Sequence, residues 1–507
     1  MTIKYDLLTD SVVSWRGRNR LTQRGTLPAL LAALAGDEVM DFPLARAHQQ
    51  QPWSMFLTQL AAIALHRAGS ETPSREECDW TEKLLRLTNG AHEPWCLLVE
   101  DLSKPAFFQP PIPEKVMESW KVVETPDDLD LLVTAKCHDI KKGLISADTI
   151  EAWVYALCTV QTTQGFPGRG YNGIARMNGG YGNRPRVGLS PGPTHGERFS
   201  RDVHVLLAEW PELLARGFAN EGVALVWCQP WDGKTSIPLA SLAPHFIEAC
   251  QRVRFAGSVD GLIARRTTTS ARFCASDVDG GDVGDCWCPV DREKGSILTP
   301  GSRGFDYKLM AEMLFGGQYA PAPAQRQREF DSNEMLFCAS ALVRGQGKTE
   351  GLHERLLPIP GKVRNVLLRP KERESLGRRA LDRVKDAARM RSKVLYPALK
   401  LLALGEMTPA DALDTRVDER FFDALFSSVG ETDDTARTAW EDELARFAME
   451  ELALAIERTP LPESRYWRVT SAARSMFFGC LMKQFPDVSE RRDQRTHAQT
   501  LEPQASD

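Results

Sequence analysis

Residues 433–458 read DDTARTAWEDELARFAMEELALAIER, a stretch in which apolar side chains recur at helical spacing. The apolar stripe consists of Trp440, Leu444, Phe447, Ala448, Leu452 and Ile456. Similar helical segments cover residues 372–404, 409–428 and 465–485, and Thr408 before Pro409 and Asp411 is typical of a helix start. Because the breaks between these segments are short, the sequence predicts an antiparallel four-helix bundle over residues 367–486.

The pattern of apolar residues is different before residue 367. Residues 27–34, 53–67 and 75–87 carry apolar positions at helical spacing, whereas residues 120–366 are irregular and contain short apolar runs. One such run, residues 223–228, is expected to be a buried strand. The prolines between the two regions predict a surface-tracking or polyproline-like connector; they are Pro105, Pro110, Pro111 and Pro113.

The predicted fold class is therefore α+β. A large, mixed and loop-rich N-terminal domain is expected over residues 1–366, followed by the helical bundle. The polar residues 487–507 are expected to form a disordered tail.

Composition narrows the class of protein. The chain has 507 residues, of which 42% are hydrophobic and 26% charged, and its net charge of -5 argues against a protein that coats nucleic acid over its whole surface. The eleven cysteines are an odd number, and no leader or membrane-spanning run is evident. We expect free thiols, a cytoplasmic location and no membrane partner.

Residues 165–188 read GFPGRGYNGIARMNGGYGNRPRVG and hold eight glycines, four arginines, two tyrosines and no carboxylate. Glycine allows close approach of the main chain to a ligand, and arginine binds phosphate and base edges. This segment follows an apolar run at residues 152–160, which indicates a rigid support. The pattern favours a loop that faces a polyanion; the alternative is a flexible surface loop.

Several motifs resemble catalytic sites but lack a required residue. The segment RGQGKTEG, residues 344–351, ends like a phosphate-binding loop, yet Leu342 occupies the position of its first glycine. It leaves open an alternative function, a nucleotide-binding enzyme that uses this segment around a phosphate. Ser190 lies in a G-x-S-x-G pattern, but Pro191 lacks the N–H that an oxyanion hole needs. No catalytic residues and no cofactor are predicted.

A metal site is weakly indicated. Cys274, Cys286 and Cys288 offer three thiolates to zinc, although a Cys-x-Cys spacing is tighter than usual and no fourth ligand is evident.

Four stretches, in order along the chain, resemble the CasA family, which forms the large subunit of the type I-E CRISPR Cascade complex. They are residues 104–111 (KPAFFQPP), residues 130–141 (DLLVTAKCHDIK), the Gly-rich segment, and residues 344–355 (RGQGKTEGLHER). The resemblance implies a non-catalytic protein that recognises the protospacer-adjacent motif (PAM) of double-stranded DNA, mainly from the minor groove. It also implies that the protein opens the duplex for the guide RNA and docks a helicase-nuclease, with other Cascade subunits as partners.

The resemblance also implies roles for particular residues. The PAM loop corresponds to Gly165, Phe166, Gly168, Arg169, Gly170 and Tyr171. The duplex wedge corresponds to Gln346, Gly347, Lys348 and Thr349. The loop that contacts the 5′ handle of the guide RNA near the PAM, residues 134–142, includes Lys136, Cys137, His138, Lys141 and Lys142. Lys294 is the candidate for a hairpin lysine that completes minor-groove reading.

The first bundle helix is strongly basic, because residues 361–400 contain thirteen Lys or Arg against four acidic residues. Its arginines are candidates for contacts with a nucleic-acid backbone: Arg378, Arg379, Arg383 and Arg389. The alternative is a solvated helix face with pairing inside the helix.

Overall fold

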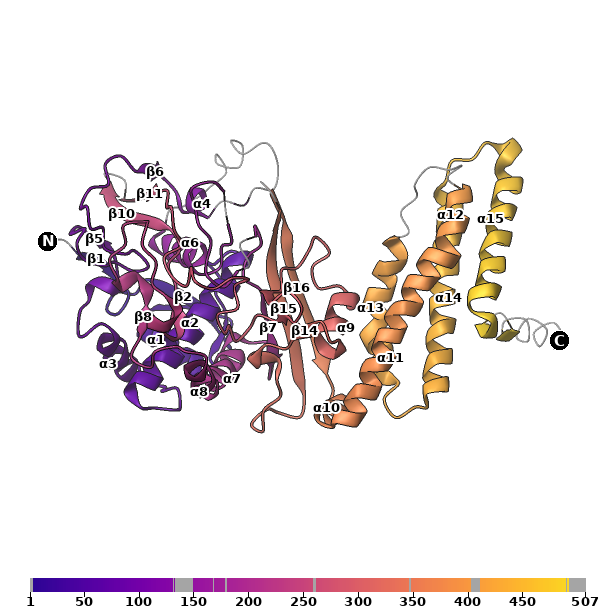
Figure 1. Ribbon diagram of the computed structural model, residues 1–507, viewed down its shortest axis with the longest axis horizontal. Helices are drawn as coiled ribbons and strands as arrows, with labels where there is room; N and C mark the ends of the chain where they lie inside the picture. The colour runs from indigo at the N-terminus through magenta and orange to yellow at the C-terminus, as the bar shows by residue number, and fades with distance from the viewer. Residues whose placement is uncertain are drawn as a thin grey trace. The chain divides into compact units, whose positions relative to one another are not determined.

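A computed structural model describes residues 3–130, 132, 149–166, 168–177, 180–258, 261–345, 348–402, 411–488 and 490–491. The chain has an α+β fold, as the sequence predicted, and divides into two compact units (Figure 1). The N-terminal unit comprises Met1–Phe305 and Gln318–Ile359, and the C-terminal unit comprises Asp306–Gly317 and Pro360–Asp507.

The boundary between the two units differs from the predicted one, which lay after residue 366. Helix α9 (Tyr307–Phe315) belongs to the C-terminal unit, where the Tyr307 ring packs 5.1 Å from Phe421 and its hydroxyl donates to Asp414 Oδ1 at 3.0 Å. Helix α10 (Gly361–Leu368) also belongs there. These contacts join residues more than a hundred positions apart, so local sequence patterns do not reveal them.

The N-terminal unit contains small sheets around a helical core. Its helices are α1 (Leu27–Ala35), α2 (Ala47–Ala68), α3 (Glu77–Leu87), α4 (Pro126–Leu129), α6 (Ile150–Thr162), α7 (His195–Ala208) and α8 (Trp210–Ala215). Its strands are β1 (Ile3–Asp6), β2 (Val13–Gly17), β3 (Thr22–Gly25), β4 (Val39–Asp41), β5 (Cys96–Val99), β6 (Lys121–Val123), β7 (Arg186–Ser190), β8 (Val223–Leu225), β9 (Leu242–Ile247), β10 (Arg252–Ser258), β11 (Gly261–Thr267), β12 (Val290–Asp291), β13 (Ser296–Ile297), β14 (Tyr319–Ala320), β15 (Met335–Gly345) and β16 (Lys348–Ile359).

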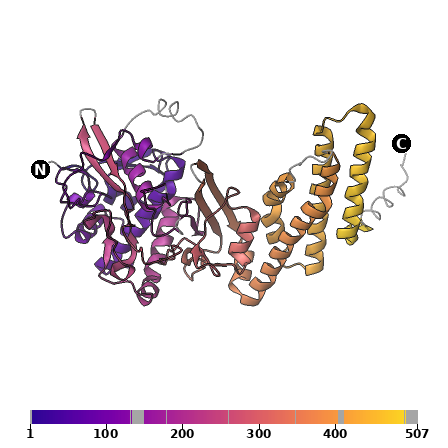
Figure 2. The same ribbon diagram turned by 45° about the horizontal axis from the view of Figure 1, so that its top comes forward.

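The strands pair in six groups, with the orders β1-β5, β3-β2-β4, β10-β11-β6, β8-β9, β13-β12-β14 and β16-β15-β7. All pairs are antiparallel except β8-β9. Figure 2 shows the pink β10-β11 pair as a hairpin. The predicted strand over residues 223–228 is shorter than expected, because a 3-10 turn follows β8 at Val226–Cys228.

Two buried helices dominate the core of this unit. The tryptophan ring of Trp53 on α2 meets Tyr155 on α6 edge to face at 5.3 Å, and both side chains are fully buried. At the end of α6, buried Gln161 uses its whole amide group. Its Nε2 donates to the carbonyls of Phe108 and Gln251 at 2.9 Å, and its Oε1 accepts from the N–H groups of Cys250 and Gln251 at 2.9 and 2.7 Å. This side chain fixes the point from which the Gly-rich segment departs.

The prediction of a surface-tracking connector near residue 105 is wrong. Residues 106–112 are buried, and the rings of Phe107 and Phe108 pack against Phe56 of α2 at 5.7 and 5.0 Å. Gln109 accepts from the N–H of Phe255 at 2.7 Å and donates to the carbonyl of Leu97 at 2.8 Å. The aromatic pair explains the difference, because burial of two rings outweighs the preference of flanking prolines for the surface.

The C-terminal unit contains the predicted four-helix bundle, drawn in orange to yellow in Figures 1 and 2. Its long helices are α11 (Pro370–Arg389), which continues through a π-helical turn (Met390–Leu395) into α12 (Tyr396–Leu402), then α13 (Asp411–Ser427), α14 (Asp433–Arg458) and α15 (Glu463–Gln484). The apolar stripe predicted on α14 is buried at every position. In the part of the chain that the structure describes, no helix is long and apolar enough to cross a membrane.

Two residues after position 487 pack on the bundle. Val488 is buried, and the Arg491 guanidinium pairs with Asp442 of α14 at 2.8 Å. The tail predicted to begin at residue 487 therefore contributes to the bundle as far as residue 491, and residues 492–507 lie outside the described residues.

Replacing Leu444 by Ala is expected to destabilise the C-terminal unit by about 2–5 kcal/mol, because Leu444 is fully buried and truncation leaves a cavity. Denaturant unfolding followed by far-UV circular dichroism measures the loss. The control is Trp467→Ala on α15, where the side chain is 77% exposed and the change is expected to stay within about 0.5 kcal/mol. Equal losses for the two variants would contradict the packing described here.

Candidate nucleic-acid interface

The tip of the Gly-rich segment is a tight turn at residues 168–171. Its ends are joined by a hydrogen bond from the N–H of Tyr171 to the carbonyl of Gly168 at 3.0 Å. Gly168 has φ +151° and Gly170 has φ +84°, values that side-chain-bearing residues rarely adopt. Arg169 between them is exposed. A Cβ atom on Gly168 would meet nothing within 4 Å, whereas one on Gly170 would lie 2.8 Å from Thr268 Cγ2, so the open main chain of the turn is at Gly168.

The end of β11 anchors this turn. The N–H of Thr269 donates to the carbonyl of Gly170 at 2.7 Å, and Asn172 Nδ2 donates to Thr269 Oγ1 at 3.0 Å. The Arg266 guanidinium lies 4.1 Å from the centroid of the Tyr171 ring, a cation–π contact that holds the tyrosine against the fold. Arg266 was not among the predicted site residues, because nothing in the sequence ties the end of β11 to residue 171.

Gly165, which the sequence placed in the recognition loop, has a different role. It is buried, and a Cβ atom there would lie 2.1 Å from the carbonyl oxygen of Gly182. The N–H of Phe166 donates to the carbonyl of Gly180 at 3.0 Å, so the two arms of the segment lie against each other at this point. The absence of a side chain at Gly165 therefore allows the arms to meet and does not serve ligand approach.

Three of the four arginines in the segment face inward. Arg176 pairs with Glu248 at 2.8 Å, Arg184 with Asp285 at 2.5 Å, and Arg186 with Asp202 at 2.9 Å, and all of these side chains are buried. The expectation that the arginines of this segment face a polyanion is wrong for these three positions. The missing carboxylates are supplied by distant parts of the chain, which leaves Arg169 as the arginine of the segment that is exposed.

The candidate hairpin lysine lies beside the same segment. Lys294 is exposed in the turn between β12 and β13, and its N–H donates to Asp291 Oδ1 at 3.0 Å. The hairpin packs on the Gly-rich segment through a shared apolar cluster of Ile174, Met177, Cys250, Cys288 and Ile297, with Val290 at its edge. The structure thus brings the hairpin of Lys294 together with the segment that carries the turn.

Two of the wedge candidates, Lys348 and Thr349, lie at the end of the long β15-β16 hairpin (Figure 1). Gln346 and Gly347 lie outside the described residues; Lys348 is exposed and pairs with Glu350 at 2.8 Å, and Thr349 is half-buried. The pairing register shifts after Val343, so that Glu350 is an extra residue in β16 and the hairpin is bulged next to its turn.

This hairpin contradicts the interpretation of residues 344–351 as a phosphate loop. A phosphate loop joins a strand to a helix, whose N-terminus faces the phosphates. Here the segment joins two antiparallel strands, and β16 continues to Ile359.

Arg344 connects the hairpin with the turn electrostatically. Burial lowers the pKa of Arg266, the Tyr171 ring that it covers opposes this, and the charge of Arg344 lowers the pKa further. Arg344, like Arg266, was not among the predicted site residues. The predicted wedge consists of residues near the hairpin turn and does not include this strand residue before it.

The structure describes the other predicted residues only in part. Lys136, Cys137, His138, Lys141 and Lys142 lie outside the described residues. Arg383 is buried over the Trp440 ring and donates to the carbonyl of Ala436, and it lines a pocket together with Arg378 and Arg379.

The remaining arginines of α11 are partly engaged within the bundle. Arg379 donates to the Ser428 carbonyl at 2.7 Å and to Asp433. Arg389 pairs with Asp386 at 2.8 Å. Arg378 is largely exposed and approaches Glu374 at 3.8 Å.

The cysteines proposed for zinc are not gathered. Cys286 and Cys288 belong to different packing clusters, Cys274 lies in the main core, and burial raises the pKa of all three thiols. Among the described residues, no group of three or more His, Cys, Asp or Glu side chains is placed to hold a metal ion.

Comparison with solved structures identifies the fold. CasA (Cse1) from Thermus thermophilus matches with a TM-score of 0.64 at 15% identity, covering 94% of this chain and 100% of that one. Cse1 from Thermobifida fusca matches with a TM-score of 0.63 at 13% identity, covering 95% and 98%. A chain of a CRISPR RNA-guided surveillance complex matches with a TM-score of 0.52 at 15% identity, covering 94% and 100%.

The chain has the CasA fold. At these identities the likeness establishes the fold over nearly the whole chain. No protein-family model matches the sequence, and no curated relative matches it.

Replacing Gly165 by Ala is expected to destabilise the N-terminal unit by about 1–3 kcal/mol, because the added methyl group overlaps the Gly182 carbonyl. Thermal unfolding measures the effect. The control Arg169→Ala alters an exposed side chain four residues away and is expected to change stability by less than about 0.5 kcal/mol. A tolerated Gly165→Ala would show that the arms of the segment do not meet as described.

Proposed function

We propose that this chain is the large, non-catalytic subunit of an RNA-guided CRISPR surveillance complex in the cytoplasm. In this proposal it recognises the PAM in double-stranded DNA, helps to open the duplex for guide RNA pairing, and docks the helicase-nuclease. The observation that carries the proposal is the exposed, side-chain-poor turn at residues 168–171, on a chain with the CasA fold.

The turn has the chemistry that a minor groove requires. The groove is narrow and offers mainly acceptor atoms, so a reader must be slim and must bring donors. Gly168 has open space around its Cα, and Arg169 supplies a guanidinium that can bind the flanking phosphates. The anchor on Thr269 and Arg266 holds the turn in one shape, which lowers the entropy lost on binding.

Two neighbouring elements supply further contacts in this proposal. Lys294 extends from a hairpin that packs on the same segment, and we assign it to minor-groove reading. Lys348 and Thr349 stand at the end of a stiff two-stranded hairpin, and we assign this end, with Gln346 and Gly347, to the wedge. Inserting a wedge costs a few kcal/mol per unstacked step, which phosphate contacts and pairing with the guide RNA have to offset.

A protein partner is supported by the outer face of α15. Trp467, Phe478 and Met482 lie on one side of this helix, and their side chains are 77%, 41% and 62% exposed. Exposed large apolar side chains gathered on one face are typical of interaction sites. We assign this face to another subunit of the complex or to the helicase-nuclease.

Two sequence motifs resemble active sites but lack the geometry of one, and this supports the non-catalytic role that we propose. Ser190, in the hydrolase-like motif, is buried and donates to the carbonyl of Gly192 at 2.6 Å, and Pro191 follows it. The phosphate-loop-like segment is a β-hairpin.

The proposal predicts that Gly168→Ala weakens binding to PAM-bearing duplex DNA at least tenfold, because a methyl group on the turn blocks its approach to the groove floor. The measurement is a DNA-binding titration of the complex assembled with guide RNA and partner subunits, using duplexes with and without the PAM. Because phosphate contacts depend on salt, the titration is carried out at one fixed ionic strength.

Gly261→Ala provides a matched control. Gly261 also has a positive φ, +131°, and open space around it, so the substitution brings similar backbone strain. It lies at the other end of β11, roughly 20 Å from Thr267 at about 3.3 Å per residue. If both variants lost binding equally, or if Gly168→Ala bound normally, the turn would not be the PAM reader.

Trp467→Ala is expected to lower the affinity of the chain for its protein partners by about tenfold or more while leaving stability unchanged, because exposed aromatic residues often dominate interfaces. Co-purification with the partner subunits, followed by a helicase-nuclease binding assay, separates the two candidates. Normal assembly together with normal nuclease docking would remove α15 from the interface.

A further inference from the structure

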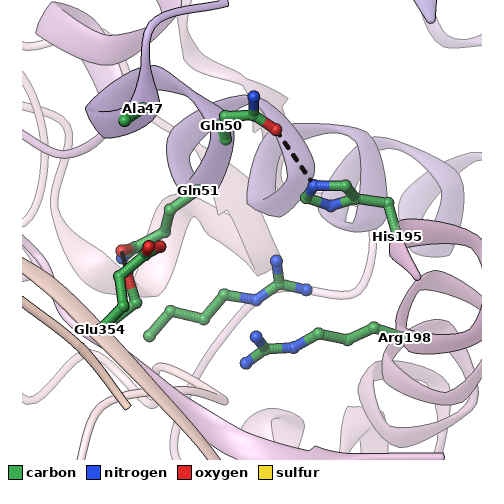
Figure 3. A pocket seen from close by; sticks show the side chains of 8 residues that line it. Ala47, Gln50, Gln51, His195, Arg198 and Glu354 are labelled. Atoms are coloured by element: carbon green, nitrogen blue, oxygen red, sulfur yellow. Dashed lines mark hydrogen bonds between the residues drawn. The ribbon is translucent and has the colours of Figure 1, made fainter. Parts of the chain in front are cut away.

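A pocket of about 250 Å³ lies in the N-terminal unit (Figure 3), and none of the residues of the turn 168–171 lines it. It is bordered by α2, the first turns of α7, and the β7-β15-β16 sheet. The lining residues are Ala47, Gln50, Gln51, Arg186, His195, Arg198, Ser340 and Glu354. Two guanidinium groups therefore share one partly enclosed space.

These two arginines are incompletely paired. Arg186 is 2% exposed at its side chain; its NH2 donates to Asp202 at 2.9 Å and its NH1 to Ser54 Oγ at 2.8 Å, while its Nε has no partner among the described residues. Arg198 has neither Nε nor NH2 bonded within that same part of the chain, and its Nε lies 3.7 Å from Asp202. Figure 3 shows the Arg198 side chain reaching into the pocket.

The carboxylate between them is shared. Besides Arg186, Asp202 Oδ2 accepts from the indole N–H of Trp287 at 2.8 Å. Asp202 Oδ1 lies 3.6 Å from Arg201 NH1 and has no hydrogen-bond partner among the described residues, so one buried negative charge serves three guanidinium groups and an indole. Buried donors without acceptors are rare in proteins, and each calls for an explanation such as a bound ion.

His195 does not add a third cation. Burial, together with the charges of Arg186 and Arg198, lowers its pKa to about 3. The Gln50 amide donates to the Phe42 carbonyl at 3.1 Å, which turns its oxygen toward His195 Nε2 at 3.3 Å. The imidazole is therefore neutral, with its proton on Nε2, and forms one wall of the pocket.

The amide and hydroxyl groups on the opposite wall are already bonded to protein. Gln51 Nε2 donates to the carbonyl of Arg184 at 3.0 Å, and Gln51 Oε1 accepts from Ser340 Oγ at 2.7 Å. The unused hydrogen-bonding capacity of the pocket is therefore mainly that of donors, and it comes from the two guanidinium groups. Glu354, which is exposed, places a negative charge at the rim.

We propose that this pocket binds a phosphate group, from free inorganic phosphate or from a small phosphorylated molecule. Guanidinium N–H groups match the geometry of phosphate oxygens, and charge-assisted bonds of this kind are the stronger ones in proteins. The bound group would lie against the guanidinium groups of Arg186 and Arg198, which both line the pocket. The site is separate from the proposed PAM reader and does not depend on it.

Isothermal titration of the full chain with inorganic phosphate tests the proposal. Saturable binding with one site per chain is expected, and Arg198→Gln is expected to weaken it by about 10- to 100-fold through loss of charge-assisted bonds. Arg24→Gln, at an exposed arginine on β3, is the control and is expected to bind as the parent protein does. Lack of phosphate binding by the parent protein at millimolar concentration would overturn the proposal.

A second variant keeps the test decisive if Arg198→Gln fails to fold. Glu354→Gln removes the negative charge at the rim and is expected to strengthen phosphate binding several-fold. Unchanged binding in Glu354→Gln, or equal weakening in Arg198→Gln and Arg24→Gln, would place the phosphate elsewhere. Titration with adenosine monophosphate distinguishes the sources: tighter binding than inorganic phosphate points to a nucleotide, and equal or weaker binding points to the free ion.

Discussion

The structure depends on a buried cluster of charges that fixes the Gly-rich segment to the core. Asp285 accepts from Arg184 at 2.5 Å and lies 3.5 Å from Arg176, which in turn pairs with Glu248 at 2.8 Å. Burial alone would raise the pKa of Asp285, but the two guanidinium groups hold it below its usual value. Breaking a pair of this kind leaves an uncompensated buried charge and costs about 3–5 kcal/mol. These ion pairs thereby hold the Gly-rich segment, which has no core of its own, in one conformation.

This constraint connects the fold with the proposed function. A segment with many glycines loses much conformational entropy on folding, and most of its length is held by ion pairs and by the meeting of its two arms. The remaining turn at residues 168–171, in which Arg169 is exposed and the other residues are half-buried, is held by Thr269 and by Arg266 of β11. A rigid base with a slim exposed tip is suited to enter a narrow groove at low entropic cost.

Local patterns in the sequence predicted the parts of the fold that depend on neighbours along the chain. The stripe on α14 is an example, because helical spacing alone places Trp440 and Leu444 on one buried face. The sequence could not predict interactions between distant residues. Arg184 and Asp285 are 101 positions apart, so an arginine that faces the interior looks the same in sequence as one that faces DNA. The buried state of Phe107 and Phe108 was missed for the same reason, since their partner Phe56 lies on α2.

The central claim is that the main chain around Gly168 and Gly170 faces the minor groove of target DNA. A photo-crosslinking amino acid at position 169, in the complex assembled with guide RNA, tests it most directly. With a duplex that carries the PAM, the account predicts a crosslink to the sugar or base of a nucleotide within the PAM. A crosslink to a partner protein alone, or to DNA remote from the PAM, would contradict it.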